Sequence, residues 1–295
     1  PEAVLGLEIH LRVATRTKLF CGCPVTFGAP PNTACCPVCL GHPGALPVLN
    51  AAALEKGLRL AAALGFEVPE LVSFDRKSYG YPDLPKGYQI TQLDRPLGRR
   101  GQLAYETADG RTAGLRLVRL HLEEDAARSE HSPHESRLDF NRAGVPLLEI
   151  VTAPDLRSPG DAVRAARAIR EIARAVGASG AALERGEMRV EPNVNVRGAD
   201  GAVTPITEVK NLGSFAALRG AIRFEIERQT AVLADETGSR REGRTTRGWD
   251  EEREETVLQR RKEAEAQYRY FPEPDLPPVR IDPALLERLA AELPE

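Results

Sequence analysis

The stretch AVLGLEIHLRV, residues 3–13, decides the fold that we expect. Its odd positions from 5 to 13 are all apolar, and this alternation predicts a strand with one buried face. Side chains two positions apart on a strand share a face, so Glu8 and His10 lie together on the opposite face. The first predicted strand therefore presents a carboxylate beside an imidazole.

Other apolar runs carry further acidic side chains. Residues 115–122 lead directly into Glu123, Glu124 and Asp125, and the run 145–151 contains Glu149. A run at 190–196 places three polar side chains on one face: Glu191, Asn193 and Asn195. Carboxylates in apolar strands are costly unless a cation meets them, so we expect these strands to converge on a cation.

The types of ligand indicate which cation this is. Oxygen ligands with one imidazole are typical of a divalent ion such as Mg²⁺, the usual partner of substrate phosphates. Two simpler interpretations stay open, namely a structural histidine and a solvated strand end at 123–125. Adjacent strand residues point opposite ways, so Glu123 and Glu124 both reach one ion only if the strand ends or bulges there.

All five cysteines of the chain lie within residues 21–39. Four of them form the pattern C-x-C, twelve residues, C-x-x-C, which suits a tetrahedral structural zinc site: Cys21, Cys23, Cys36 and Cys39. Free buried thiols or a redox pair are the alternatives, and Cys35 competes for the fourth position. Four sulfur ligands leave no open position on the metal, so we expect zinc to hold the loop 21–44 together and not to act in catalysis.

The overall charge is nearly balanced. The 295 residues include 40 Lys and Arg against 43 Asp and Glu, so any contact with RNA needs a local basic patch. The chain is long enough for one large core or two domains. No apolar stretch approaches the ~18 residues of a membrane span, and no signal peptide is visible. Clustered cysteines in a long chain favour metal binding in a reducing cytoplasm.

The rest of the pattern predicts an α+β fold, with helices in separate stretches and mostly antiparallel strands. Helices are expected at 51–64, from Ser158 to Gly177, from Ser214 to about 235, and at 283–293. Strands are expected at 188–197, at 203–212, and in a hairpin over 101–125 that turns at Asp109-Gly110. We interpret 74–96 as irregular, 236–255 as a mobile polar loop, and 268–282 as a proline-rich segment.

The segment from Arg76 to Gln92 mixes basic, aromatic and amide side chains. We expect four of them to meet a nucleotide or an RNA end, and the alternative is an ordinary surface loop: Lys86, Tyr88, Gln89 and Gln92. No P-loop or glycine-rich dinucleotide motif occurs, so phosphates must meet scattered groups. The candidates, which could instead simply pair with nearby acids, are Arg189, Asn193, Lys210 and Asn211.

Seven motifs resemble one family, the B subunits of bacterial aspartyl/glutamyl-tRNA(Asn/Gln) amidotransferases. They cover almost the whole chain in family order: GLEIH at 6–10, PVCLGHPGALPVLN at 37–50, RKSYGYPDLPKGYQITQLD at 76–94, RLHLEEDA at 119–126, NRAGVPLLEIVTAPDLRSP at 141–159, EVKNLGSF at 208–215 and YRYFPEPDLPP at 268–278.

The resemblance implies a fold called the amidotransferase cradle, over residues 1–282, with a mostly antiparallel sheet, flanking helices and the four-cysteine zinc loop. It further implies that residues 283–295 begin a helical domain whose remainder, like a C-terminal tail domain, is absent here.

The activity implied by the resemblance is that of a ligase that forms a carbon–nitrogen bond with glutamine as the amide donor. ATP phosphorylates the side-chain carboxylate of misacylated Glu-tRNA(Gln) or Asp-tRNA(Asn), and ammonia then displaces the phosphate. The ammonia comes from a glutaminase A subunit, which forms a cytoplasmic heterotrimer with this chain and a small C subunit. The cofactors implied are ATP, Mg²⁺ and structural Zn²⁺.

The resemblance also assigns roles to residues. It places the metal-binding acids and histidine of the family on Glu8, His10, Glu123, Glu124 and Glu149. Of these, we expect Glu8, His10, Glu124 and Glu149 to be catalytic. The strand MRVEPNVNV at 188–196 departs from the family, because Glu191 stands where the family has Asp and Pro192 follows it.

Two other functions stay open. One is a zinc-bearing RNA-binding or assembly module without catalysis. The other is an archaeal E-type subunit that acts only on Glu-tRNA(Gln). ATP consumption would separate the first from an enzyme.

Overall fold

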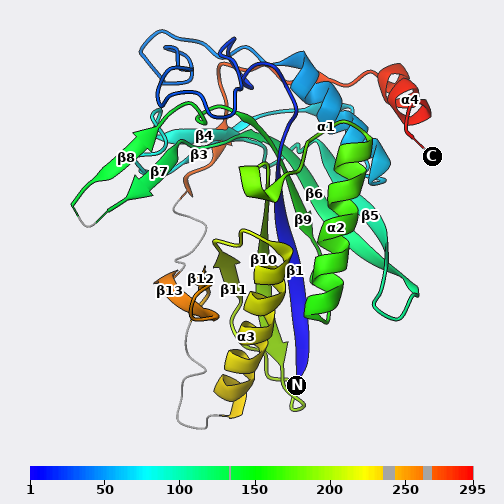
Figure 1. The fold of residues 1–295 in the computed structure, drawn as a ribbon. Helices are drawn as coiled ribbons and strands as arrows, with labels where there is room; N and C mark the ends of the chain where they lie inside the picture. Colours follow the sequence, from blue (N-terminus) through cyan, green and yellow to red (C-terminus); the bar gives the residue numbers. More distant parts are fainter. Residues whose placement is uncertain (133, 235–242, 262–267, 295) are drawn as a thin grey trace.

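The computed structural model describes residues 1–132, 134–234, 243–261 and 268–294 (Figure 1). Within these ranges the helices are α1 (Ala51–Ala63), α2 (Pro159–Ala175), α3 (Phe215–Ala234) and α4 (Pro283–Ala291), with a 3-10 turn at Leu183–Arg185. The strands are β1 (Glu2–Arg12), β2 (Leu71–Val72), β3 (Asp75–Ser78), β4 (Tyr88–Thr91), β5 (Gly98–Glu106), β6 (Thr112–Glu124), β7 (Arg128–His131), β8 (Ser136–Asp139), β9 (Pro146–Thr152), β10 (Met188–Arg197), β11 (Thr207–Lys210), β12 (Thr245–Asp250), β13 (Glu255–Arg261), β14 (Phe271–Pro272) and β15 (Val279–Arg280).

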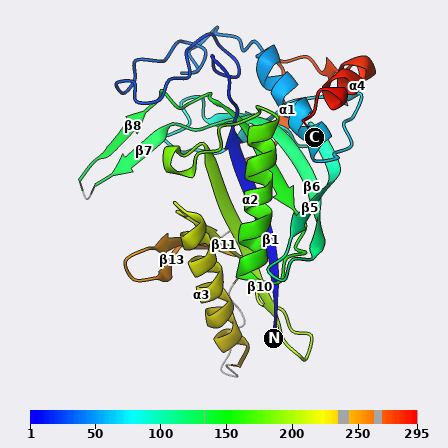
Figure 2. The same ribbon diagram turned by 45° about the vertical axis from the view of Figure 1, so that its right-hand side comes forward.

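One eight-stranded sheet organises the described residues. Its order is β13-β12-β11-β10-β1-β9-β6-β5, and every neighbouring pair is antiparallel except β11 with β12. Helices α2 and α3 lie against one face of this sheet, as both ribbon views show (Figures 1 and 2). The predicted α+β architecture, with a mainly antiparallel sheet and flanking helices, is confirmed.

The alternation in β1 produces the two faces of the sheet. Leu7 and Ile9 are fully buried in the core beneath the helices, whereas Glu8 and His10 on the other face are only partly buried. Strand β9 repeats the pattern, with Leu148 buried in the same core. Burial of these aliphatic side chains stabilises the layer of helix on sheet by roughly 1.5–3 kcal/mol each. The helix-free face is therefore available for polar chemistry.

The helix ends carry capping groups, among them the predicted Ser158, Gly177 and Ser214. Asn50 and Ser158 accept hydrogen bonds from backbone amides in the first turns of α1 and α2. Ser214 Oγ accepts from Ala217 N at 3.0 Å at the start of α3. Gly177 follows α2 with a φ of +67°, a conformation that glycine adopts without strain. At the other end of the chain, Leu289 of α4 is buried in the main core.

The predicted mobile loop at 236–255 is wrong in its described part. Residues 245–250 and 255–261 are strands β12 and β13, which extend the main sheet, while 236–242 lie outside the described residues. The error has a physical cause, because these strands carry almost no apolar alternation. Besides Gly248 and Trp249, their buried positions are threonines that form hydrogen bonds, such as Thr246 Oγ1 to Glu208 Oε2 at 3.2 Å.

Two smaller expectations also need correction. The segment 74–96, interpreted as irregular, contains the paired strands β3 and β4. The strand expected at 203–212 is shorter, because β11 covers only Thr207–Lys210 and Val203 forms an isolated bridge with Arg197. No helix in the described part of the chain is long and apolar enough to span a bilayer.

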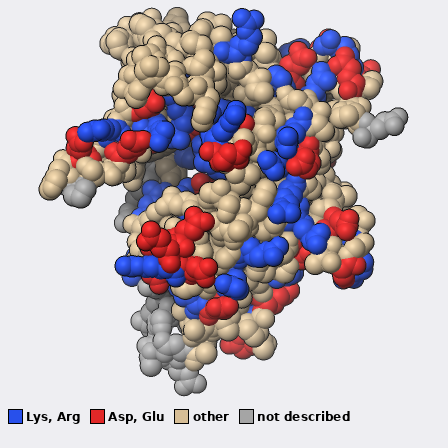
Figure 3. All heavy atoms as spheres, in the orientation of Figure 1, with Lys and Arg blue, Asp and Glu red and all other residues tan. Residues whose placement is uncertain are grey.

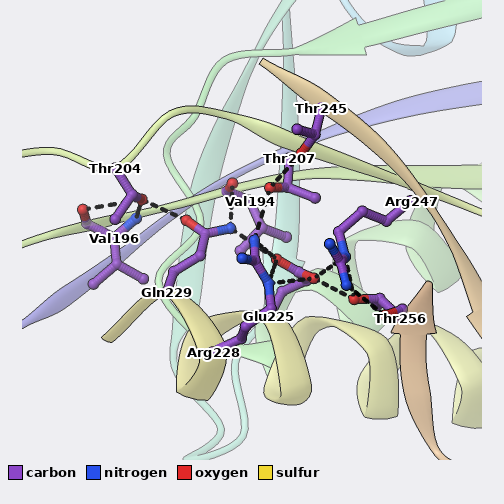
Figure 4. Close-up of polar contacts among 10 residues, drawn as sticks. All are labelled: Val194, Val196, Thr204, Thr207, Glu225, Arg228, Gln229, Thr245, Arg247 and Thr256. Atoms are coloured by element: carbon purple, nitrogen blue, oxygen red, sulfur yellow. Dashed lines mark hydrogen bonds and ion pairs between the residues drawn. The ribbon is translucent and has the colours of Figure 1, made fainter. Parts of the chain in front are cut away.

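A buried carboxylate joins α3 to the sheet edge (Figure 4). Glu225 accepts hydrogen bonds from Arg228 at 2.8 Å, Gln229 at 3.0 Å and Thr256, and its carboxylate lies 3.3 Å from Arg247. Burial raises the pKa of Glu225, but these donors outweigh burial and leave the pKa below its ordinary value. The charged carboxylate therefore ties strands β12 and β13, which lack an apolar pattern, to the helix.

We expect Glu225→Gln to lower the free energy of unfolding by about 1–3 kcal/mol at pH 7, because two guanidinium groups lose their shared anion. A depressed pKa gives stabilisation that is present above the ordinary value of 4.5 and is lost as the pH falls through the folded-state pKa. The difference between wild type and variant in the free energy of unfolding, measured in urea, should therefore shrink below pH 4.5. Glu227→Gln, at an exposed position of α3, is the matched control, and equal stability of both variants would contradict the prediction.

Candidate active site

Strand register places a row of chemical groups across the helix-free face. His10 pairs with Glu149 across β1 and β9, and Glu149 pairs with His121 across β9 and β6. His10 Nε2 lies 3.5 Å from Glu149 Oε1, and His121 Nδ1 lies 3.2 Å from Glu149 Oε2. Glu123, two residues beyond His121, approaches His10 Nε2 to 3.8 Å. Three adjacent strands thus bring two imidazoles and two carboxylates together.

The groups of this row shift one another's protonation. Burial opposes the charge of Glu149, but hydrogen bonds from His10 and His121 hold its pKa below the ordinary range. Burial also lowers the pKa of His10, yet Glu149 and Glu191 outweigh it and raise that pKa to about 9. Burial and the neighbouring Glu149 raise the pKa of Glu123. Without a metal ion, His10 is therefore the cation that balances Glu149.

A second acidic group lies beside the row. Glu8 pairs with Glu191 across β1 and β10, and Glu208 of β11 completes the group. Asn193 Nδ2 donates to Glu8 Oε1 at 2.8 Å. Lys210 Nζ lies 2.6 Å from Glu191 and 3.1 Å from Glu208, and these carboxylates raise the pKa of Lys210 against the effect of burial.

Both groups line one cavity of about 830 Å³. The sheet forms its floor, and residues of β3, β4, β13 and the segment before β14 contribute to its walls. Basic side chains line the same space, some of them paired with the acids: Lys77, Arg119, Arg142, Arg189, Lys210, Arg244, Arg260 and Arg261. Figure 3 shows Lys and Arg side chains bordering a hollow between the β7–β8 hairpin and β13. The cavity can therefore hold an anion close to clustered carboxylates.

Asp125 sits at the end of the carboxylate row and is already paired. Arg189 donates to its two oxygens at 3.1 and 3.2 Å, and Arg142 Nε lies 3.6 Å away. Burial raises the pKa of Asp125, but Arg189 and Arg142 outweigh burial and lower it. Two guanidinium groups share one carboxylate here, so this corner of the cavity keeps a positive charge.

Glu124 does not join the other predicted acids. Strand β6 is irregular between Leu117 and Arg119 but pairs regularly with β9 from Arg119 to its last residue, so Glu124 lies on the same face as the buried Leu122 and points away from the cavity. Its carboxylate pairs with Lys86 and accepts from Ile90 N at 3.0 Å. These groups line a separate pocket of about 90 Å³ beneath the cysteine loop, where Gly41 packs so closely on Lys86 that a Cβ would collide with it.

Three more predicted nucleotide contacts lie elsewhere. Tyr88 is held under the guanidinium of Arg76, 4.2 Å from its ring centroid, and faces the small pocket. Gln92 is buried, where its side-chain oxygen accepts from Leu97 N and Leu122 N. Asn211 is exposed just beyond β11, with a φ of +65°.

The other predicted side chains, apart from Asn193, line the main cavity: Glu8, His10, Gln89, Glu123, Glu149, Arg189, Glu191 and Lys210. Asn193 reaches the cavity through its hydrogen bond to Glu8.

This geometry agrees with a comparison against known families. Residues 3–287 match the profile described as the GatB/GatE catalytic domain. The chain belongs to this family.

Individual relatives of this catalytic domain share one description, the B subunit of an aspartyl/glutamyl-tRNA(Asn/Gln) amidotransferase. The chain is 50% identical over 295 residues to the protein of that name from Thermus thermophilus, covering all of this chain and 61% of that protein. Those from Rhodopirellula baltica and Carboxydothermus hydrogenoformans are 46% and 47% identical, over 99% and 100% of this chain and 61% and 62% of theirs. The chain thus spans about three fifths of the length of these relatives.

Several cavity residues of this GatB/GatE catalytic domain were not predicted. His121 lies two positions before Glu123 in the same strand and therefore on the same face, so alternation alone was enough to find it. Glu208 likewise lies two positions before the predicted Lys210, so the two side chains share one face of their strand. Lys77, Tyr268 and Tyr270 had no such signal, because the short pairing of β3 with β14 brings them to the cavity.

The donor atoms of this domain fit divalent metal ions. Two sets of side chains each bring one possible ligand atom per residue within 4.8 Å of the others. The first set is His121, Glu123 and Glu149, and the second is Glu8, Glu191 and Glu208. His10 Nδ1 and His121 Nε2 are buried, and neither has a hydrogen-bond partner within the described part of the chain. Carboxylate oxygens together with an imidazole suit Mg²⁺ or Mn²⁺. In the second set, the ammonium of Lys210 already neutralises part of the negative charge.

The cysteine loop fits zinc. The sulfur atoms of four cysteines lie within 4.8 Å of one another: Cys21, Cys23, Cys36 and Cys39. Around a tetrahedral zinc ion the distance between two sulfur ligands is about 3.8 Å. A hydrogen bond from Cys21 and the ammonium of the buried Lys18, 3.4 Å away, help to lower the pKa of the Cys39 thiol to about 4. Cys35 stands apart, with its sulfur 3.8 Å from Asn141 Oδ1. All five cysteines are free of disulfides.

Proposed function

We propose that this domain activates the side-chain carboxylate of Glu-tRNA(Gln), Asp-tRNA(Asn) or both by ATP-dependent phosphorylation, and that ammonia then converts it to the amide. The observation that carries the proposal is a single cavity in which two sets of metal-type ligands face basic side chains. Membership of the GatB/GatE catalytic domain family and the names of the relatives support the same reaction.

The chemistry explains why such a cavity is needed. A carboxylate is a poor electrophile, because ammonia could displace only an oxide ion from it. Transfer of the γ-phosphoryl group to a carboxylate oxygen gives an acyl phosphate and ADP. Ammonia attacks the carbonyl carbon, and phosphate leaves with the bonding electron pair. The acyl phosphate also hydrolyses in water, so the reaction benefits from a recessed site.

The residues of the cavity have distinct proposed roles. His121, Glu123 and Glu149, and beside them Glu8, Glu191 and Glu208, would hold Mg²⁺, which would supply charge compensation for the phosphates when bound. His10, 3.5 Å from Glu149, would join them as a ligand in its neutral form. Lys77, Arg260 and Arg261 would bind phosphate oxygens from the opposite wall. Arg189, steadied on Asp125, keeps one corner positive for the substrate carboxylate.

The residues outside the cavity receive other roles. Glu124, which points away from the reacting groups, is proposed as a positioning residue that fixes the end of β6 through Lys86 and Ile90. The zinc-bound loop covers this end of the strand. The names of the relatives describe one component of a larger enzyme. We propose that its partners are a glutaminase, the A subunit, which supplies the ammonia, and a small C subunit.

The test uses the complete natural protein with its partner subunits. We expect ATP consumption only when Mg²⁺ and Glu-tRNA(Gln) or Asp-tRNA(Asn) are both present, with one ADP released per amide formed. Uncharged tRNA is the control, since it offers the same RNA without the carboxylate. Amide formation without ADP release, or no ADP release with either charged tRNA, would refute the proposal. A preference for one charged tRNA assigns the substrate.

A further inference from the structure

Three tyrosines and a lysine form a wall of the main cavity that the phosphate chemistry does not explain. Tyr79 follows β3, while Tyr268 and Tyr270 precede β14. The pairing of Phe271 with Arg76 brings these distant segments side by side. All three rings and Lys77 line the cavity that contains the acidic groups.

The rings form a continuous cluster. Tyr79 and Tyr268 have centroids 5.9 Å apart with planes at 77°, and Tyr268 and Tyr270 have centroids 6.2 Å apart at 67°. Lys77 Nζ lies 4.8 Å from the Tyr268 centroid. In a T-shaped pair one ring uses its edge, so each pair leaves at least one face of each ring outside the contact. All three tyrosines are only half-buried, so part of the cluster stays accessible.

The chemistry of this wall differs from that of its surroundings. Burial raises the pKa of Tyr79 and Tyr270, so both hydroxyls stay neutral donors at pH 7. Neutral rings attract a phosphate only weakly, and the arginines of the cavity bind such an anion better. Aromatic side chains do stack well on nucleobases, since every base has a π-face. Lys77 Nζ lies over one face of the Tyr268 ring and of the Tyr79 ring, 4.8 and 5.8 Å from their centroids, so a base would stack on the remaining faces.

We propose that Tyr79, Tyr268 and Tyr270 form a stacking platform for an adenine base. The choice of adenine rests on the proposed function, because ATP and the 3′-terminal adenosine of tRNA both carry this base. Both must bring their reacting group to the carboxylate cluster, and the platform lies on the wall of that same cavity.

The first experiment measures binding directly, in the complete natural protein with its partner subunits. Tyr268→Leu and Tyr270→Leu keep side-chain bulk but remove the aromatic face. If the platform holds the base of ATP, each variant should bind ATP about tenfold or more weakly by titration calorimetry. Tripolyphosphate, which lacks the base, should bind as it does to wild type. Phe271→Leu is the matched control, because this 45% exposed neighbour does not line the cavity and should leave ATP binding unchanged.

The second arm identifies the source of the base. The probe is 3′-glutamylamino-3′-deoxyadenosine, a stable mimic of the charged tRNA end. Weakened binding of ATP alone assigns the platform to the nucleotide, and weakened binding of the mimic alone assigns it to the tRNA end. If both variants fold by circular dichroism and bind both probes like wild type, the platform proposal is overturned. That result would leave the phosphorylation proposal standing, since it is judged by ADP release.

Discussion

Replacing Glu149 by Gln should reduce the proposed ATP-dependent amidation at least about a hundredfold. Glu149 is the central member of the carboxylate row, 3.5 Å from His10 and 3.2 Å from His121. The amide keeps the volume of the side chain but removes the charge that balances His10 and that would balance a bound divalent ion. The loss should therefore appear in the phosphorylation step and in metal affinity together.

The measurement has two readouts. ADP release in the presence of charged tRNA reports the reaction, and Mn²⁺ titration followed by electron paramagnetic resonance reports the ion. Glu106→Gln is the matched control, since it changes an exposed glutamate on β5 of the same sheet and should keep both values. Unchanged Mn²⁺ affinity and turnover in Glu149→Gln would remove Glu149 from the proposed metal site.

Loss of one cysteine of the zinc loop should destabilise the domain by several kcal/mol. Structural zinc contributes roughly 10–16 kcal/mol to the folding of small zinc domains, and part of this stabilisation is expected here. Cys39 is the most buried ligand, and it lies close to Lys18. In Cys39→Ser the sulfur ligand is lost, so a lower melting temperature and less than one zinc per chain by mass spectrometry are expected.

Cys35→Ser provides the matched control within the same loop. This cysteine neighbours Cys36 in the chain but lies outside the group of four sulfurs. Its variant should keep one zinc and the wild-type melting temperature. If Cys35→Ser lost the metal and Cys39→Ser kept it, the assignment of the four ligands would be wrong.

Alternation of apolar residues was sufficient to predict much of the fold and half of the site. It placed Glu8 and His10 on one face of β1, and Glu149 on the matching face of β9. For Glu124 it was not sufficient, because β6 is irregular between Leu117 and Arg119, and only the regular part after Arg119 puts Glu124 on the buried face of Leu120 and Leu122. The prediction for Glu124 relied on family motifs, which show that a residue is present but not which face it occupies.

The remaining features depend on contacts between distant segments. Strands β12 and β13 have no apolar period, and their place in the sheet depends on the parallel pairing of β12 with β11 and on Glu225. Tyr268 and Tyr270 reach the cavity through a two-residue strand. Such short polar pairings leave no periodic signal in a sequence.

The end of β6 connects the two metal-type sites of the domain. Glu123 faces the cavity, and the next residue, Glu124, is fixed by Lys86 directly beneath Gly41 of the cysteine loop. These adjacent side chains point to opposite faces of the strand, so a displacement of the strand end at the cysteine loop would move both. Oxidation of the loop thiols, or loss of a zinc ion held by them, is therefore expected to disturb the proposed phosphate chemistry at a distance.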